Sequence, residues 1–331
     1  MEKRKLGTSD LEITPVGFGA WAIGGGDYAF GWGDQDDVES IATIEHAIAS
    51  GINWIDTAAV YGLGRSEEVV GRALKNLGSA NRPYVFTKCS LVWNEDREIS
   101  HSLEPASIRS EVEASLKRLD IDSIDLYQIH WPRLTPADSD EGIESGWQTL
   151  VELKREGKVR NIGVSNFDAL QLERISKIEK PVSLQPPYSA LRRDIESETL
   201  PYCEANNIGT IVYSPMQAGL LSGKMTKERV AAFPANDWRT RNPYFAEPAL
   251  TKNLAIADKF KEIGERHGLT AGAAAIAWTL RLSAVTGAIV GARRPDQIDG
   301  IISAGAFRLS DDEISEIQIA LTGDLVSDTA A

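Results

Sequence analysis

Four residues of this chain carry side chains that together can move a proton: Asp56, Tyr61, Lys88 and His130. Asp56 ends the apolar segment NWID, Lys88 ends YVFTK, and His130 ends IDLYQIH. Tyr61 follows Asp56 in the loop TAAVYG. A phenol flanked by an ammonium, a carboxylate and an imidazole is suited to general acid–base catalysis. The pattern therefore predicts an enzyme.

Tyr61 is the natural proton donor of this group. A free phenol titrates near ~10, too high for easy donation at neutral pH, and a nearby ammonium lowers that pKa. We expect Lys88 to supply this charge and Asp56 to keep Lys88 charged and oriented. His130 would orient a substrate carbonyl or help to move the proton. Each residue taken alone also has a structural explanation, because Lys–Asp pairs at strand ends are often simple ion pairs.

The segments that position these residues alternate between short apolar strands and longer amphipathic helices. Eight strand–helix units in one order predict a single (β/α)8 TIM barrel over residues 1–331, whose active face lies at the carboxyl ends of its strands. We expect an N-terminal hairpin with its turn at Gly7–Asp10, extra helices, and Ser66 as a helix cap. The alternative is an open doubly wound sheet, but GFGAWAIGGG contains no glycine-rich nucleotide turn that opens a helix. The eight strands are expected within TPVGFGA, NWIDT, YVFTK, SIDLYQIH, VRNIGVS, VSLQ, IGTIVYS and TGAIVG.

Three connections on the expected active face are too long to be simple turns. They are Leu91–Glu104, Trp131–Asp140 and Leu220–Pro248. Long loops at this face often cover or line a pocket. We expect Trp93 and Trp131 from these loops, with Trp21 from the loop after the first strand, to line a substrate pocket. For any single Trp, pinning a loop to the barrel is an equal alternative.

The composition narrows the choice of partners and compartment. A net charge of −13 and a pI near 4.9 argue against nucleic acid or an anionic membrane as partner. The two cysteines, Cys89 and Cys203, follow or interrupt apolar segments, and we expect buried free thiols. We find no signal-peptide core, no membrane-spanning segment and no metal-ligand spacing, so a cytoplasmic location and no metal are expected. No motif indicates the oligomeric state.

The segments GINWIDTAAVYGLGRSEEVVGRAL, FTKCS, IDLYQIHWP, GKVRNIGVSNF and YSPMQAGLLSGK closely resemble the aldo-keto reductase superfamily over nearly the whole chain. GVSNF and IVGARRPDQI resemble the bacterial branch related to sugar-aldehyde, glyoxal and glycerol-type reductases, with potassium-channel β subunits as more distant relatives. The Asp, Tyr, Lys and His of that family match the four residues introduced above. The resemblance implies a barrel that binds NADP(H) in an extended form without a Rossmann domain.

The resemblance also implies cofactor contacts. Ser165, Asn166 and Gln185 match the group that binds the nicotinamide carboxamide, and Tyr213 matches the ring that stacks on the nicotinamide. The segment from Ser214 to Lys224 matches a pyrophosphate-binding belt. The full set implied is Gly19, Ala20, Trp21, Ser165, Asn166, Gln185, Tyr213, Ser214, Pro215, Met216, Gly219, Leu220, Ser222, Lys224, Arg239, Gly291, Arg293 and Gln297.

The adenosine end departs from the family pattern in two places. Gly291 and Ala292 replace a lysine–serine pair of eukaryotic members, and Ile301 replaces an expected asparagine. Arg293 and Arg294 are suited to a 2′-phosphate, which is bound by cationic and often bidentate donors. We expect NADPH/NADP as the cofactor, with NADH possible.

The expected activity is hydride transfer between the nicotinamide and a small carbonyl or alcohol. Hydroxyaldehydes, glyoxals, sugars and polyols such as glycerol are the expected substrates. Two alternatives stay open at this point. One is a nicotinamide-sensing regulatory subunit with little turnover. The other is an aldolase in which Lys88 forms a Schiff base.

Overall fold

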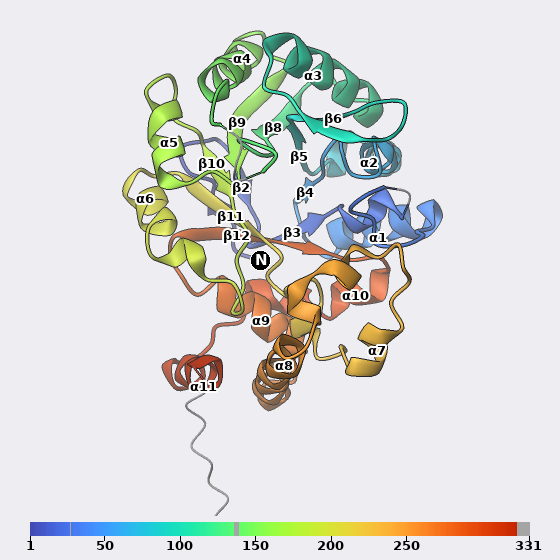
Figure 1. Cartoon of the computed structure of the whole chain (residues 1–331), viewed down its shortest axis with the longest axis vertical. Helices are drawn as coiled ribbons and strands as arrows, with labels where there is room; N and C mark the ends of the chain where they lie inside the picture. The colour runs from blue at the N-terminus through green and yellow to red at the C-terminus, as the bar shows by residue number, and fades with distance from the viewer. Residues whose placement is uncertain (27, 136–138, 323–331) are drawn as a thin grey trace, which may run out of the picture.

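Eight parallel strands close into a barrel in the computed structural model, which describes residues 1–26, 28–135 and 139–322 (Figure 1). Every neighbouring pair of these strands is parallel. The predicted (β/α)8 barrel is confirmed. In order around the barrel, the strands are β3 (Val16–Gly19), β4 (Trp54–Asp56), β5 (Tyr84–Cys89), β8 (Ile124–Ile129), β9 (Val159–Ser165), β10 (Ser183–Gln185), β11 (Gly209–Tyr213) and β12 (Val285–Gly291).

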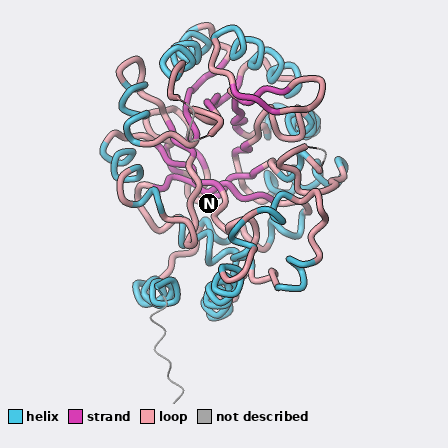
Figure 2. The backbone as a smooth tube through the Cα atoms, in the orientation of Figure 1, coloured by secondary structure: helices cyan, strands magenta, loops and turns pink. Residues whose placement is uncertain are grey.

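Helices surround the barrel on the outside, as Figure 2 shows. The extra helix α9 (Ala271–Thr279) is buried along its whole length, which explains its small and apolar composition. The helices that follow the strands are α1 (Asp37–Ala49), α2 (Arg65–Leu77), α3 (Pro105–Leu119), α4 (Ile143–Arg155), α5 (Ala169–Ser176), α6 (Thr199–Ala205), α8 (Ala249–Arg266) and α10 (Pro295–Asp299). The additional ones are α7 (Lys227–Ala231), α9 (Ala271–Thr279) and α11 (Asp311–Thr322).

The inside of the barrel has an apolar layer beneath a polar layer. The apolar layer includes Trp54, Phe86, Leu126, Ile211 and Ile289. Alternate residues of a strand point to the same face. Two positions further along β4, β5 and β8, the chain therefore directs Asp56, Lys88 and Gln128 into the barrel as well. This second layer lies at the carboxyl ends of the strands.

The N-terminal hairpin closes the opposite end of the barrel. Its strands are β1 (Arg4–Lys5) and β2 (Glu12–Ile13), and the predicted turn at Gly7–Asp10 lies between them. Gly7 has a φ of 53°, and a Cβ there would lie 2.2 Å from the backbone oxygen of Val182. Only glycine fits so close to the start of the strands. Leu6, Leu11 and Ile13 of the hairpin complete the apolar layer.

Ser66 does not cap α2, so this prediction is wrong. The helix begins at Arg65 after Gly64, whose φ is 103°. Ser66 instead donates a hydrogen bond of 2.9 Å to the backbone oxygen of Ala20 and lies 2.8 Å from the hydroxyl of Thr57. Its side chain therefore ties α2 to the barrel rather than completing the first helical turn.

The three long connections contain further elements. Residues 91–104 hold the hairpin of β6 (Leu91–Trp93) and β7 (Ile99–His101). Residues 136–138 of the second connection lie outside the described residues. The third contains α7 and the short 3-10 helices η4 (Leu220–Ser222), η5 (Trp238–Arg241) and η6 (Pro243–Phe245). Cys89 and Cys203 are free and buried, as expected. Within the described chain, every helix is too short or too polar to cross a membrane.

Candidate active site

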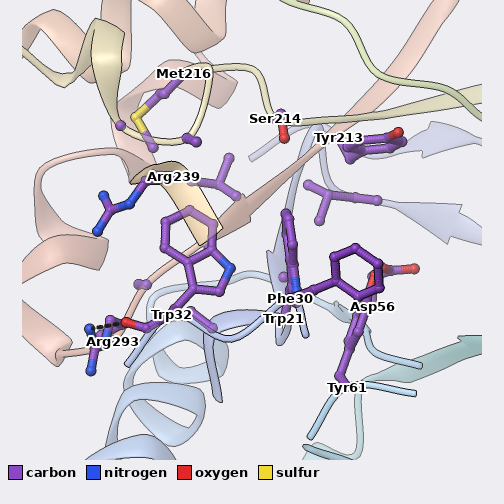
Figure 3. A pocket seen from close by; sticks show the side chains of 18 of the residues that line it. Trp21, Phe30, Trp32, Asp56, Tyr61, Tyr213, Ser214, Met216, Arg239 and Arg293 are labelled. Atoms are coloured by element: carbon purple, nitrogen blue, oxygen red, sulfur yellow. Dashed lines mark hydrogen bonds between the residues drawn. The ribbon is translucent and has the colours of Figure 1, made fainter. Parts of the chain in front are cut away.

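A cavity of about 1080 Å³ opens at the carboxyl ends of the barrel strands. Figure 3 shows Asp56 and Tyr61 at one end of it and Arg239 and Arg293 at the other. His130 also lines the first end. Three of the four predicted proton-transfer residues therefore border one continuous cavity, which also reaches the two arginines.

Lys88 lies behind this wall rather than in the lining. Its side chain is fully buried, and Nζ donates hydrogen bonds to Asp56 Oδ2 at 2.6 Å and to the backbone oxygen of Thr57 at 2.8 Å. The hydroxyl oxygen of Tyr61 is 3.5 Å from the same nitrogen. Burial lowers the pKa of Lys88, and the Asp56 carboxylate opposes that effect. The ammonium is thus held beside the phenol by a buried carboxylate.

The pKa of Tyr61 is raised well above its ordinary value, whereas the sequence predicted a lowered one. Burial is the main cause, and the negative charge of Asp56 adds to it. The positive charge of Lys88 does not prevail, because Asp56 is paired with it at 2.6 Å. Tyr61 is accordingly a neutral phenol that keeps its proton.

His130 is a neutral imidazole beside Tyr61. Burial lowers its pKa well below the ordinary value, and the positive charge of Lys88 contributes. The imidazole packs against the Tyr61 ring edge to face, with centroids 5.6 Å apart. The backbone oxygen of His130 accepts a hydrogen bond of 2.9 Å from Asn166 Nδ2. A neutral imidazole can donate one hydrogen bond to an oxygen in the cavity.

Ser165, Asn166, Gln185 and Tyr213 form a connected group next to these residues. Ser165 Oγ donates to the backbone oxygen of Gln185 at 2.7 Å, and the Tyr213 hydroxyl donates to Asn166 Oδ1 at 2.9 Å. Gln185 Nε2 donates to Asp56 Oδ1 at 2.8 Å. The amide oxygen of Gln185 is therefore the end that remains to accept hydrogen bonds.

Gln128 is a site residue that the sequence reasoning missed. It is fully buried, and its amide contacts both Asp56 and Gln185. Strand alternation contained the signal, because Gln128 stands two residues before His130 in IDLYQIH and so points to the same face. A polar residue at an inward position of a barrel strand needs a polar partner.

Aromatic side chains form one wall of the cavity, and two of the three predicted tryptophans belong to it. Trp21 and Trp131 line the cavity. The Trp21 ring stacks on Tyr61 and on Trp238, with centroids 6.2 and 5.2 Å away. Trp93 is not among the described lining residues. Its ring instead lies against the guanidinium of Arg118, whose Cζ is 5.9 Å from the ring centroid.

Most residues of the implied cofactor set line the same cavity. Two described members are set back from it. Ala20 is buried, and Leu220 packs with Met225, Phe245 and Leu250. The lining members are Gly19, Trp21, Ser165, Asn166, Gln185, Tyr213, Ser214, Pro215, Met216, Gly219, Ser222, Lys224, Arg239, Gly291, Arg293 and Gln297.

Arg293 and Arg239 lie at the far end of the cavity and already have protein partners. All three guanidinium nitrogens of Arg293 contact one loop, at the Trp32 and Asp34 backbone oxygens and at Gln35 Oε1. Arg239 pairs with the buried Asp237 at 2.6 Å. The sequence did not indicate that the loop after β3 would be held in this way.

The arrangement agrees with comparisons of the whole chain. The aldo/keto reductase family model matches residues 15–322. Aldo-keto reductase YhdN of Bacillus subtilis is 36% identical, and the match covers 97% of this chain and 94% of that protein. An NADH-specific methylglyoxal reductase of Escherichia coli is 38% identical, with coverage of 94% and 95%.

Solved structures agree as well. A glycerol dehydrogenase of Gluconobacter oxydans superposes with a TM-score of 0.87 and 36% identity, and the match covers 100% of this chain and 99% of that one. The holo form of an aldo-keto reductase of Bacillus halodurans has a TM-score of 0.77 at 26% identity, covering 97% and 96%. Sequence and fold lead to the same assignment, and this chain belongs to the aldo/keto reductase family.

Proposed function

We propose that this protein transfers a hydride between NADP(H) and a small carbonyl or alcohol, with Tyr61 as the general acid and base. The observation that carries the proposal is the position of the Tyr61 hydroxyl, at the cavity wall and 3.5 Å from the buried Lys88 nitrogen. Burial raises the pKa of Tyr61, which keeps the phenol protonated. A protonated phenol can donate to a carbonyl oxygen, and an adjacent ammonium stabilises the phenolate that donation leaves behind.

The residues present fit a bound nicotinamide cofactor. A single cavity of about 1080 Å³ is lined by both Tyr61 and Arg293, and this volume provides room for a dinucleotide between them. Gln185 offers its amide oxygen to a carboxamide N–H, and the part-buried Tyr213 offers a ring face. Gly219 has a φ of 92°, which lets the backbone approach a pyrophosphate closely. When bound, the reduced nicotinamide supplies a hydride to the carbonyl carbon.

The chain's own residues then divide the remaining work. Tyr61 gives its phenolic proton to the carbonyl oxygen during reduction and takes it back during alcohol oxidation. Lys88, held by Asp56, stabilises the phenolate. The neutral His130 imidazole donates a hydrogen bond that orients the carbonyl oxygen. The aromatic wall that includes Trp21 keeps water away from the reacting atoms.

Small uncharged molecules fit the end of the cavity near Tyr61. Trp21, Val60, Leu91, Ile99 and Trp131 line it, and none of these side chains carries a charge. We infer methylglyoxal, glyceraldehyde and related hydroxyaldehydes as substrates for reduction, and glycerol for oxidation. The names of the Escherichia coli and Gluconobacter oxydans relatives support this choice.

The preference for NADP(H) rests on the cations at the far end of the cavity. Lys224, Arg293 and Arg294 line it, and cationic donors favour a 2′-phosphate. Asp34 and Glu39 line the same end and oppose that preference. NADH is therefore expected to work as a weaker second cofactor.

The two rival functions have less support. Lys88 Nζ is fully buried and donates to Asp56 and Thr57, so a substrate carbonyl cannot reach it to form a Schiff base. The relatives reported above are named as reductases and a dehydrogenase, which gives no support to a regulatory subunit without turnover.

A substrate screen tests the proposed function. The purified protein is mixed with NADPH or NADH and with methylglyoxal or glyceraldehyde, and with NADP⁺ and glycerol for the reverse reaction. The absorbance of reduced nicotinamide should fall in the first case and rise in the second. Absence of turnover with every small aldehyde and both cofactors would overturn the proposal.

A further inference from the structure

Gln128 is a buried amide in the polar layer of the barrel whose partners are Asp56 and Gln185. It stands directly opposite Lys88 in the register of β8 with β5. Gln128 Nε2 is 3.5 Å from Asp56 Oδ1, and Gln128 Oε1 accepts from Gln185 Nε2 at 3.3 Å. The side chain thus contacts one residue of the proton-transfer group and one residue of the implied carboxamide site.

The two carboxylate oxygens of Asp56 accept hydrogen bonds from different sides, one from the proton-transfer group and one from the implied carboxamide site. Oδ2 accepts from Lys88 at 2.6 Å, while Oδ1 accepts from Gln185 at 2.8 Å and faces the Gln128 amide. With Nε2 of Gln185 turned toward two acceptors, its oxygen faces away from them and toward the cavity. Gln128 and Asp56 together select this orientation of the Gln185 amide.

We propose that Gln128 is a positioning residue that joins the cofactor-binding amide of Gln185 to the Asp56–Lys88 pair. The inference rests on the proposed function and deepens it. Gln128 touches neither cofactor nor substrate, since it is absent from the described cavity lining. It acts through Gln185 on carboxamide binding and through Asp56 on the charge that faces Tyr61.

Packing alone does not account for an amide at this position. The inward residue two positions earlier on β8 is Leu126, in the apolar layer. Leucine or methionine has a volume close to that of glutamine, and burying an amide costs free energy unless it finds hydrogen-bond partners. The contribution of the Gln128 amide to the site is therefore its hydrogen bonds with Asp56 and Gln185, which an apolar side chain of the same size could not form.

The electrostatic consequence has a definite sign. The phenol of Tyr61 faces the charged pair of Asp56 and Lys88, the His130 ring, and the phenols of Tyr28 and Tyr213. Amide N–H dipoles pointing at Asp56 Oδ1 partly offset its negative charge. Without the Gln128 donor, more of that charge is felt by Tyr61, and its pKa rises further. Alcohol oxidation, which needs the phenolate, then requires a higher pH.

The main test compares the binding of two ligands to the folded, full-length protein, prepared without bound cofactor, and to its variants. NADP⁺ carries the carboxamide, whereas 2′-phospho-ADP-ribose lacks the whole nicotinamide ring. In Gln128→Met, calorimetry should show NADP⁺ binding weakened about fivefold, the order expected for one lost hydrogen bond, with 2′-phospho-ADP-ribose binding unchanged. The rate of glycerol oxidation rises with pH as the phenolate of Tyr61 forms, and this rising part of the pH profile should move to higher pH.

A matched control removes a buried amide elsewhere. Asn161 lies on the neighbouring strand β9, and its Nδ2 donates to Asp10 of the hairpin region at 3.0 Å. Asn161→Leu should leave the affinity ratio of the two ligands and the pH profile as in wild type.

A second variant keeps the shape and changes the protonation. The carboxyl of Gln128→Glu can donate to Asp56 only while protonated, and it repels Asp56 once ionised. Its glycerol oxidation relative to wild type should therefore be restored at low pH and decline as pH rises, a dependence absent from Gln128→Met. A merely structural role would not produce this difference between the variants.

The outcomes separate the inference from the function on which it rests. Two results would overturn the role of Gln128. One is an equal loss of affinity for both ligands in both variants, and the other is affinities within twofold of wild type together with an unchanged pH profile. Wild-type protein that binds neither NADP⁺ nor NAD⁺ would instead overturn the proposed function. If wild type binds only NAD⁺, the same comparison is made with NAD⁺ and ADP-ribose.

Discussion

At the scale of single residues, the proposed general acid is a phenol that is difficult to ionise. Tyr61 is desolvated and faces the negative charge of Asp56, and both effects raise its pKa. The adjacent Lys88 ammonium is largely committed to Asp56. Such a phenol suits the reductive direction, in which it must arrive protonated and lose its proton only as charge develops on the carbonyl oxygen.

Replacement of Tyr61 by phenylalanine tests this role. Tyr61→Phe should lower kcat for aldehyde reduction by about 10²–10⁴-fold, the usual contribution of a positioned general acid. The dissociation constant of NADPH should stay within about twofold of wild type, because the ring remains. Tyr84→Phe, at the start of β5 and so at the other end of the barrel, is the control and should retain full turnover. A Tyr61→Phe enzyme as active as wild type would contradict the assignment.

The pKa directions also predict the pH dependence of each direction of catalysis. Reduction uses the phenol, whose raised pKa keeps it protonated, so kcat/KM for reduction should be flat through neutral pH. Oxidation uses the phenolate and should still be rising as pH approaches the ordinary phenol value of ~10. Because the pKa of His130 is lowered, its protonation should produce no limb near pH ~6.5.

Steady-state profiles from acid to alkaline pH check these expectations, with His130→Gln as the companion variant. A limb near neutrality that disappears in His130→Gln would show that the imidazole titrates there, contrary to its burial.

At the scale of elements, the loops after β3 and β12 are joined across the far end of the cavity. Arg293 follows β12, and its guanidinium contacts the loop from Trp32 to Gln35. Gln35 Nε2 returns a hydrogen bond of 3.1 Å to the backbone oxygen of Arg293. On the other side, the backbone N–H of Trp238 donates to Gly31 at 3.2 Å. The loop after β3 is thereby held between two others.

Arg293→Met should consequently affect the two cofactors unequally. A 2′-phosphate loses a cationic donor, so NADPH binding should weaken at least about tenfold, as expected for a charge-assisted hydrogen bond. NADH has no 2′-phosphate, so its affinity should fall only by the amount that the ordered loop contributed to binding. Fluorescence titration with each cofactor measures the ratio, and Arg241→Met, which removes a single bond to Ala29, is the control. Equal losses for NADPH and NADH would mean that Arg293 acts only by holding the loop.

At the scale of the whole molecule, the apolar layer inside the barrel and the proposed active site lie at different ends of the barrel. The hairpin and the inward residues of the apolar layer close one end, and the polar layer with its cavity forms the other. Leu11 of the hairpin is fully buried, whereas Leu170 on α5 is 68% exposed. This separation makes stability and cofactor binding independently measurable.

Leu11→Ala should lower the free energy of unfolding by about 2–5 kcal/mol, because it removes buried methyl groups and leaves a cavity. NADPH affinity at low temperature should not change. Leu170→Ala is the matched control and should alter unfolding by less than about 0.5 kcal/mol. Urea denaturation measures both. Equal unfolding midpoints for the two variants would show that the hairpin does not support the barrel.

Much of the architecture could be predicted from sequence because its signals are local. The period of the apolar residues indicated eight strand–helix units, and the ends of NWID, YVFTK and IDLYQIH placed Asp56, Lys88 and His130 on one face. Gln128 follows the same period, since it stands between Leu126 and His130 on the inward face of its strand. The prediction that Ser66 caps a helix is wrong because a serine hydroxyl, which often caps helices, can equally well form hydrogen bonds to a neighbouring element, here to Ala20.

The sequence by itself determined the barrel, the types of residue at its active face and their order along the chain, since alternation and strand–helix succession are properties of neighbouring residues. Only the tertiary structure decided how these residues influence one another. The pKa of Tyr61 depends on burial and on the Asp56–Lys88 pair, which brings together side chains 32 residues apart. The contact of Arg293 with the loop after β3 spans more than 250 residues. Distances and desolvation of this kind are set when the barrel closes.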